Sequence, residues 1–196
     1  MVSILVLYYS KHGHTKLLAQ QIAKGIEQQG AQAILRTVEP ITHVSNHEVS
    51  SAIPEHGDVY VSKSDIISCD ALALGSPSHF GNMASGLKYF IDSLSDVWLK
   101  GALVDKPACV FTSSSSMHGG QESTLLSMML PLLHHGMCIL GLPYSEPELH
   151  STKTGGTPYG VSSVNITNNN TLSDDETTLA IAMGKRLANA AKRLKQ

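Results

Sequence analysis

The sequence predicts an α/β fold in which helices cover both faces of a doubly wound, five-stranded parallel sheet. Short continuous apolar runs alternate along the chain with longer amphipathic stretches. This alternation is typical of βαβ units, whose parallel strands are buried on both faces. The chain has 196 residues, 42% of them hydrophobic, which suits one domain with a substantial core. We therefore expect a single domain spanning residues 1–196.

The first βαβ unit has the clearest pattern. Residues 2–9 form a continuous apolar run, and the stretch from Thr15 carries an apolar helical face that ends at Gly30. Four more strands are predicted at 31–37, 71–74, 108–112 and 138–142, and further helices at 85–94, 121–135 and from 174 on. We expect Pro131 to kink or split its helix. Ser173 and Glu176 have capping-box spacing at the start of the last helix.

Two stretches lack strand or helix periodicity. Residues 39–64 are polar and contain two prolines, and residues 143–172 contain Gly155-Gly156-Thr157-Pro158-Tyr159-Gly160 and an asparagine run. Both compositions are typical of loops. We therefore predict irregular insertions at about these positions.

The charge balance and the cysteines exclude several classes of protein. A formal net charge of −2 gives no basic field for nucleic acid and no acidic docking face. Cys69, Cys109 and Cys138 lack CxxC spacing and lie in or beside apolar runs, so we expect buried, reduced thiols. The N-terminal apolar run is too short to cross a membrane and has no signal-peptide pattern. A cytoplasmic protein without an integral membrane segment is expected.

The histidines do not predict a metal site. His12 and His14 are close in sequence, as are His134 and His135. Neither pair has HExxH spacing, and no carboxylate or cysteine recurs at a ligand interval. We expect no functional metal.

The loop from Ser10 to Thr15 predicts an anion site. It follows a buried strand, offers hydroxyls and consecutive backbone N–H groups, and opens a helix. The positive end of the helix dipole favours a phosphate there. The loop is neither GxGxxG nor a Walker motif, so a phosphomonoester such as that of FMN is the simpler ligand. The alternative is that Ser10 and Thr15 only cap the helix.

Two more loops follow predicted strands and are expected at the same sheet edge. Residues 77–83 combine a proline, Phe80 and a glycine, against which a flat ring could lie. Residues 113–120 are rich in hydroxyls and could donate to the polar edge of an isoalloxazine. The alternatives are that Phe80 belongs to the core and that the serines form a solvated loop.

Five segments together resemble the WrbA family over nearly the whole chain. They are Ser10-Lys11-His12-Gly13-His14-Thr15, Gly75 to Met83, Gly119-Gly120-Gln121-Glu122, His134-His135-Gly136-Met137 and Gly155 to Gly160. The resemblance implies a flavodoxin-like three-layer fold with strand order 2-1-3-4-5. It also implies an NAD(P)H:quinone oxidoreductase that binds FMN, is reduced by NADH or NADPH, and assembles as a homotetramer.

The resemblance also assigns site residues. Ser10, Lys11, His12, Gly13, His14 and Thr15 would hold the phosphate; Pro77, Ser78, His79 and Phe80 would line the flavin; and Ser113, Ser114, Ser115, Ser116, Met117, His118 and Gly119 would meet its polar edge. His134 would complete the site, and Trp98 would flank the quinone and nicotinamide pocket. His12 stands where the family usually has a tyrosine that contacts the nicotinamide nucleotide, and the loop at 113–122 is one residue longer than the family's STGTGGGQE pattern.

The implied reaction is a ping-pong transfer, in which a nicotinamide nucleotide reduces the flavin and a quinone then takes two electrons to become a hydroquinone. His134 is a candidate proton donor, since an unperturbed imidazole titrates near neutrality. Two other readings remain. A Ser-His-Asp hydrolase would suit the serine-rich loop, but the chain lacks the GxSxG elbow. An FMN-binding regulatory protein or electron shuttle would use the same cofactor without quinone turnover.

Overall fold

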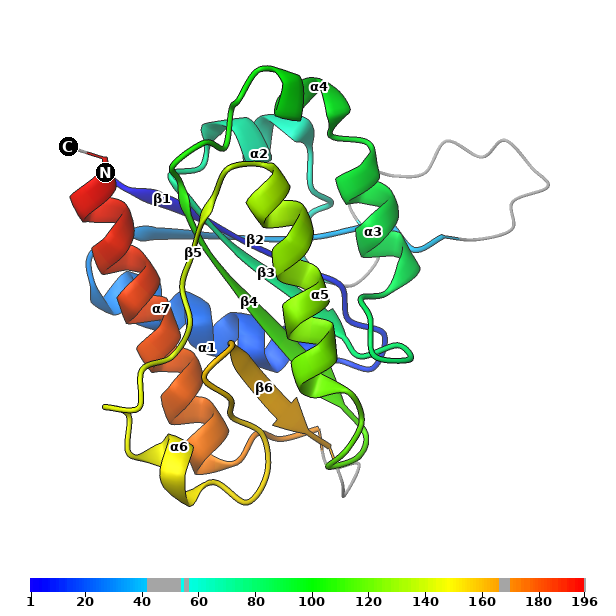
Figure 1. The fold of residues 1–196 in the computed structure, drawn as a ribbon, viewed down its shortest axis with the longest axis vertical. Coiled ribbons are helices and arrows are strands. Elements are labelled where there is room, and N and C mark those ends of the chain that lie inside the picture. Colours follow the sequence, from blue (N-terminus) through cyan, green and yellow to red (C-terminus); the bar gives the residue numbers. More distant parts are fainter. Residues whose placement is uncertain (42–53, 55–56, 166–169, 196) are drawn as a thin grey trace.

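A six-stranded parallel sheet forms the centre of the molecule (Figure 1). The computed structural model describes residues 1–41, 54, 57–165 and 170–195. The strands are β1 (Ser3–Tyr8), β2 (Gln32–Thr37), β3 (Ala71–Pro77), β4 (Pro107–Ser114), β5 (Cys138–Ile139) and β6 (Val161–Val164). Five of them follow the order β2-β1-β3-β4-β5, and β6 also pairs with β4. The predicted order 2-1-3-4-5 is confirmed.

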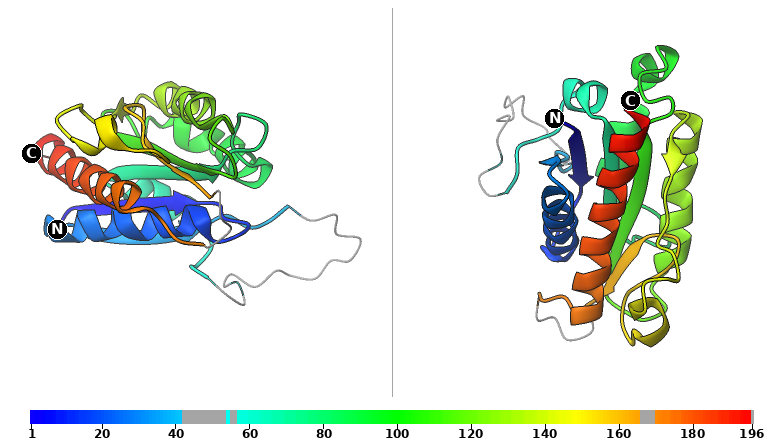
Figure 2. Two further views of the ribbon diagram at one scale, coloured as in Figure 1. Left: turned by 90° about the horizontal axis from the view of Figure 1, so that it is seen from below. Right: turned by 90° about the vertical axis from the view of Figure 1, so that its left-hand side faces the viewer.

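Helices cover both faces of the sheet, as predicted (Figure 2). They are α1 (His14–Gln28), α2 (Lys63–Ser68), α3 (Ser85–Asp92), α4 (Ser95–Leu99), α5 (Gln121–His134), α6 (Glu148–Ser151) and α7 (Asp174–Leu194). Alternate residues of the central strands point to opposite faces. Ile4 and Val6 of β1 pack with α1 and α7, whereas Leu5 and Leu7 pack with α3, α4 and α5.

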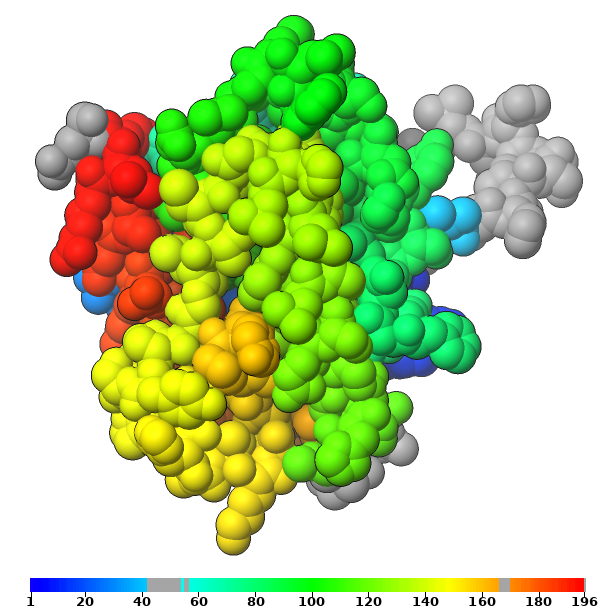
Figure 3. All heavy atoms as spheres, in the orientation of Figure 1, coloured from blue at the N-terminus to red at the C-terminus, as the bar shows by residue number. Residues whose placement is uncertain are grey.

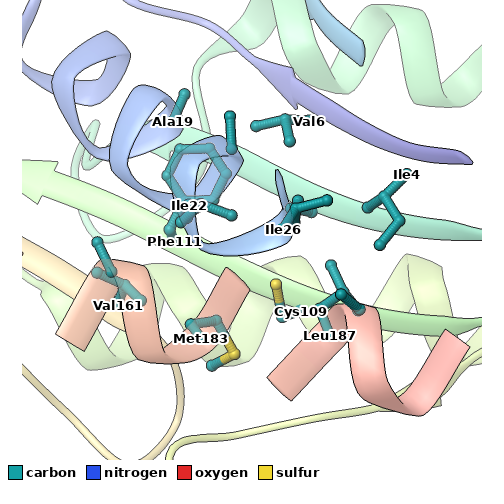
Figure 4. Packing of buried hydrophobic residues seen from close by; sticks show 14 of the residues in the cluster. Ile4, Val6, Ala19, Ile22, Ile26, Cys109, Phe111, Val161, Met183 and Leu187 are labelled. Atoms are coloured by element: carbon teal, nitrogen blue, oxygen red, sulfur yellow. The ribbon is translucent and has the colours of Figure 1, made fainter. Parts of the chain in front are cut away.

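The core under α1 and α7 depends on close backbone approach. Phe111 of β4 is fully buried between these helices and the sheet (Figure 4). A Cβ at Gly75 would lie 2.1 Å from its ring, so only glycine fits on β3 there. A Cβ at Gly184 of α7 would lie 2.1 Å from the Ile22 carbonyl of α1. The two helices therefore touch along their backbones.

The fifth strand position differs from the prediction. The strand predicted at 138–142 has only two residues, Cys138 and Ile139, which pair with the start of β4. The chain then leaves the sheet, forms α6, and returns as β6, which pairs with Phe111–Ser114 of β4. The prediction of a loop over the whole of 143–172 is therefore wrong. The strand β6 lies within this stretch, and its four residues are too few to show a recognisable hydrophobic period.

Besides α6, two helices were not expected from the sequence, and the predicted split of the helix at Pro131 does not occur. α2 begins at Lys63, inside the stretch predicted as an insertion, and α4 follows α3 after a short turn. Most of the predicted insertion at 39–64 lies outside the described residues. Pro131 lies within a continuous α5. The helix loses one backbone hydrogen bond there, but Leu125, Met128 and Leu132 hold its buried face on the sheet.

The three cysteines are free, but they do not share one environment. Cys69 and Cys109 are buried as predicted, and burial raises the pKa of these thiols to about 11 and about 12. Cys138 is exposed, so the prediction of a buried thiol is wrong there. It lies on the short edge strand β5, where α7 and α5 leave its side chain uncovered. None of the helices described is both long and apolar enough to span a membrane.

Candidate functional site

The carboxyl ends of β1, β3 and β4 meet at a cavity of about 280 Å³. Three sequence-predicted loops line it, and one further segment joins them after β6. The lining residues are Ser10, Lys11, His12, His14 and Thr15; Pro77, Ser78 and His79; Ser113, Ser114 and Ser115; and Asn165. The strand order reverses at β1, with β2 on one side and β3 on the other. A crevice at such a reversal is where open α/β sheets bind ligands.

The first loop leaves backbone donors without partners. Gly13 precedes α1 in the left-handed conformation, with φ of 87°, and no side chain caps the helix from this position. The Lys16 N–H donates to the Ser10 hydroxyl at 3.3 Å. The N–H groups of residues 11–15 have no hydrogen-bond partner within the part of the chain described. Ser10 is thus a weak cap, and most donors of the loop stay free for an anion.

Hydrogen bonds fix the three loops to one another. The Thr15 and Ser113 hydroxyls are 2.8 Å apart and join the start of α1 to the end of β4. The Ser78 N–H donates to the Ser113 carbonyl at 2.8 Å, and the Ser78 hydroxyl donates to the Gly119 carbonyl at 2.7 Å. The cavity walls are therefore preorganised by the chain itself.

His14 is the one deeply buried side chain with ring nitrogens at this cavity. It is 5% exposed, and neither Nδ1 nor Nε2 has a hydrogen-bond partner among the described residues. The amide of Asn170 lies near the ring without hydrogen-bond geometry. Burial lowers the pKa of His14, while the negative charge of Glu176 opposes this shift. An unpartnered buried imidazole calls for a ligand or an ion to satisfy it.

The rest of the loop after β4 turns away from the cavity. The carbonyls of Ser116 and Met117 accept hydrogen bonds from the Gln121 side chain at 3.0 and 3.1 Å. Met117 and His118 are exposed. Ser116, Met117, His118 and Gly119 do not line the cavity, in contrast to Ser113, Ser114 and Ser115.

Phe80 lies at the tip of a tight turn and also does not line the cavity. The backbones of His79 and Asn82 exchange hydrogen bonds of 2.8 and 3.1 Å across this turn. Phe80 has φ of 54° and a fully exposed ring, so it is not a core residue. A positive φ is costly for an aromatic residue. The turn therefore presents the ring to solvent.

Trp98 and His134 lie together at a different place in the fold. The Trp98 indole N–H donates to the His134 carbonyl at 2.8 Å, which joins α4 to the carboxyl end of α5. Both line an open hollow of about 400 Å³ with Leu94, Pro131 and His135. The strand end that contributes Ser113, Ser114 and Ser115 to the cavity leads into the opposite, amino end of α5 (Figure 1), and the 14 residues of α5 span about 20 Å. One chain therefore does not bring Trp98 and His134 to the cavity.

Sequence reasoning missed two residues of the site. Asn165, directly after β6, lines the cavity, but no strand was predicted to place it there. Glu176 fits the predicted capping box, yet its carboxylate is 1% exposed and also accepts hydrogen bonds from the Gly155 and Val164 N–H groups, both at 2.9 Å. Capping boxes are usually at the surface, so the pattern gave no sign of this burial.

A larger groove of about 740 Å³ lies elsewhere, between α7 and the segment after β5. These two segments lie side by side on the face seen in Figure 3. The groove contains none of the residues that the sequence assigned to a site, and we consider the smaller cavity the functional one. Within the described residues, no group of three metal-ligating side chains is present.

Known proteins match this chain in sequence over most of its length. The family model described as NADPH-dependent FMN reductase matches residues 2–145. A protein from Gluconacetobacter diazotrophicus named NAD(P)H dehydrogenase (quinone) is 36% identical over 99% of both chains. One of the same name from Syntrophobacter fumaroxidans is 38% identical over 98% of both.

Solved structures share the fold at lower identity. A flavodoxin, WrbA-like protein from Agrobacterium tumefaciens has a TM-score of 0.70 and 22% identity, with 99% of both chains covered. A flavodoxin from the domain Archaea has a TM-score of 0.65 and 16% identity, with 97% of this chain and 99% of that chain covered. At these identities the likeness concerns the fold alone.

Proposed function

Because the chain belongs to the NADPH-dependent FMN reductase family, we propose that it is an FMN-dependent NAD(P)H:quinone oxidoreductase. Its relatives named NAD(P)H dehydrogenase (quinone) match it over almost the full length of both chains. The proposed reaction is the two-electron reduction of a quinone to a hydroquinone at the expense of NADH or NADPH. We further propose that residues 1–196 form one FMN-binding domain.

The free donors at the start of α1 carry this proposal. A phosphate monoester needs several converging N–H groups, and residues 11–15 offer them beside the uncapped end of a 15-residue helix. The His14 ring is a further polar group, and neither of its nitrogens has a partner among the described residues. The residues present thus fit the phosphate of FMN, with Ser10, Gly13 and Thr15 shaping the loop around it.

The other lining residues suit the rest of the cofactor. Ser78 and His79 from the loop after β3, and Ser113, Ser114 and Ser115 from the end of β4, would hold the flavin ring. Bound FMN would supply the chemistry that side chains lack, namely hydride acceptance and two-electron transfer. The protein's own task is to orient the ring and to leave one side open for substrate. The hydrogen-bonded loops suit that task because they restrict the cavity to one shape.

We also propose that the site is completed by another copy of the chain, in a homotetramer. Trp98 is half exposed and cannot reach the cavity of its own chain, while Phe80 is fully exposed beside that cavity. Exposed apolar side chains on α3, α4 and α5 support an interface between copies; they are Tyr89, Leu99, Leu126, Leu130 and Leu133. His134 of a second copy would then be available to hold or donate a proton. A cytoplasmic location stays a prediction from the sequence.

Oxidation of NADH and NADPH by FMN-loaded protein, with and without benzoquinone, tests the proposal. The protein is first mixed with FMN and passed over a gel-filtration column, whose elution volume reports the assembly. We expect a retained yellow chromophore and nucleotide oxidation that depends on the quinone. Retained FMN without quinone-dependent turnover would instead support the regulatory or electron-shuttle reading. Loss of all FMN on the column would contradict the cofactor assignment.

A further inference from the structure

The buried ionisable residue that lines the phosphate cavity is a histidine. The ionisable residues that line the cavity are Lys11, His12, His14 and His79. Lys11, His12 and His79 are exposed, and only His14 is buried. A phosphomonoester carries close to two negative charges at neutral pH. Among the described residues that line the cavity, His14 is the buried group that can offset this charge. It must first take up a proton to do so.

A buried carboxylate lies in the first turn of the helix that packs against α1. Helices α1 and α7 run side by side in the same direction (Figure 2). Gly184 of α7 packs on Ile22 of α1, and the Lys192 ammonium donates to the Gln29 carbonyl about two turns further on. His14 and Glu176 thus lie in the first turns of the two paired helices, and the negative charge of Glu176 favours the protonated form of the His14 ring.

Backbone donors surround the Glu176 carboxylate. It accepts hydrogen bonds from the N–H groups of Gly155, Val164 and Ser173, all at 2.9 Å. No lysine or arginine in the described residues forms an ion pair with it. Buried charges are normally paired. Its negative charge is therefore left to act on His14.

We propose that His14 is the counter-charge of the phosphate site and takes up one proton from solvent when a phosphomonoester binds, with Glu176 stabilising the imidazolium. The inference rests on the proposed function, since it assumes that the site binds FMN by its phosphate. The proton adds to a ring nitrogen that has no partner in the described chain, and it returns to solvent when the ligand leaves. Glu176 is a positioning residue that acts through His14.

Other charged groups around His14 do not change the sign of this effect. Glu176 faces it from α7, Lys11 and His12 are on its own loop, Lys16 is in the next turn, and His79 belongs to the loop after β3. The positive charges among them are exposed or half-exposed and are screened by salt. The segment from Asn165 to Asn170 contains no ionisable side chain.

The direction of the pH dependence follows from linkage. Burial lowers the pKa of His14 in the free protein, so its ring is neutral at neutral pH. A bound phosphate dianion raises that pKa, and the complex then holds more protons than its free components. Affinity for FMN therefore falls as pH rises from about 6.5, by at most about tenfold per pH unit. Riboflavin, which lacks the phosphate, should show no such fall.

Calorimetry at pH 7.5 in two buffers with different ionisation enthalpies tests the inference directly. At this pH the FMN phosphate is already a dianion, since its second pKa is about 6, so any proton taken up goes to the protein. We expect an uptake of about half to one proton per FMN and none with riboflavin. FMN binding without proton uptake would overturn the inference while leaving the proposed function intact.

Three variants test which residue takes up the proton when FMN binds. His14→Asn should bind FMN about tenfold more weakly at pH 6.5, without proton uptake and with a flat pH profile. Glu176→Gln keeps a side chain that can form the capping box and should reduce the uptake. His150→Asn, at an exposed histidine of α6 that does not line the cavity, is the control and should behave as wild type. Proton uptake that persists in His14→Asn would overturn the inference.

A simpler ligand separates the two proposals if FMN itself fails to bind. Phenyl phosphate is a monoester without a flavin ring. If it binds with proton uptake that His14→Asn abolishes, the inference about His14 holds although the proposed cofactor is wrong. If neither FMN nor phenyl phosphate binds to protein that melts cooperatively, both proposals fail.

Discussion

The two ends of α5 (Gln121–His134) show two different ways of preparing a binding site. At its amino end, loops from three strands enclose a small cavity and are tied together by hydrogen bonds between Thr15, Ser78 and Ser113. At its carboxyl end, Trp98 and His134 border a wider, open hollow among exposed apolar side chains. The phosphate binding that we propose needs only the first region, which one chain provides, whereas the second region lacks an opposing wall. In the proposed assembly the site is divided between surfaces that one chain keeps apart.

Replacement of Gly13 by alanine should have the largest effect on the enclosed region. Alanine at φ of 87° costs roughly 1–2 kcal/mol of backbone strain, and its Cβ would lie 3.1 Å from the Asn170 amide. Relief of this strain rotates the N–H groups that face the cavity. We expect FMN affinity to fall about 100-fold, which corresponds to the loss of two charge-assisted hydrogen bonds. Fluorescence titration of FMN measures it.

Gly30→Ala is the matched control for this prediction. Gly30 follows the other end of α1 with φ of 67°, and a Cβ there meets only the Lys192 ammonium at 4.0 Å. The same type of strain should lower the free energy of unfolding by about 1 kcal/mol and leave FMN affinity unchanged. Equal loss of FMN affinity in both variants would mean that the loop conformation at Gly13 does not form the cradle.

Replacement of Trp98 by alanine should affect the open region alone. We expect quinone-dependent kcat/KM to fall about tenfold, a typical cost of losing a large aromatic contact, with a shift toward smaller assemblies in sedimentation velocity. FMN affinity should stay within about twofold of wild type, because one chain holds the phosphate. Trp98→Phe keeps an aromatic ring but removes the donor to the His134 carbonyl, and we expect an intermediate loss. A large loss of FMN affinity in Trp98→Ala would contradict the division between the two regions.

The enclosed region was predictable from the sequence because its determinants are local. The buried strand at 2–9, the loop with Gly13 and the amphipathic helix that follows are consecutive in the chain. Periodicity and turn chemistry therefore identify them together. The loops at 77–79 and 113–115 reach the same cavity because parallel strands end at one edge of the sheet.

What the sequence did not predict depends on tertiary contacts. The strand β6 has four residues and forms only because the end of β4 has a free edge for it. The burial of Glu176 follows from the segments that fold back over it at Gly155 and Val164. The separation of Trp98 from the cavity depends on the length and direction of α5, which a resemblance between motifs does not report.

Removal of the Thr15 hydroxyl should lower the affinity of the enclosed region for FMN moderately. Thr15→Val has nearly the same shape but leaves the Ser113 hydroxyl without its partner at 2.8 Å. We expect FMN affinity to fall about fivefold, corresponding to about 1 kcal/mol. A double-mutant cycle with Ser113→Ala isolates the contact between the two hydroxyls. Strictly additive losses in the cycle would show that the two residues do not act together on the cavity.

Replacement of Asp70 by asparagine should change neither region and so has the smallest effect on function. Asp70 lies just before β3, at the sheet edge opposite the cavity, and its carboxylate pairs with the Lys195 ammonium at 2.7 Å and accepts from the Ser3 N–H at 2.8 Å. Partial burial tends to raise the pKa of Asp70, but these partners outweigh it, and the pKa lies below its usual value. Such a group stabilises the fold above its unfolded pKa of about 3.9, and this contribution is lost as pH falls through the lower folded value. Asp70→Asn should therefore lower the free energy of unfolding by about 1 kcal/mol at pH 7, with the difference from wild type shrinking below about pH 4.

Urea denaturation at several pH values measures this change, and FMN affinity and quinone turnover at pH 7 should match wild type because asparagine still accepts from Ser3. A loss of either activity would mean that the opposite edge of the sheet influences the site, and the two ends of α5 could then no longer be treated as independent of the rest of the fold.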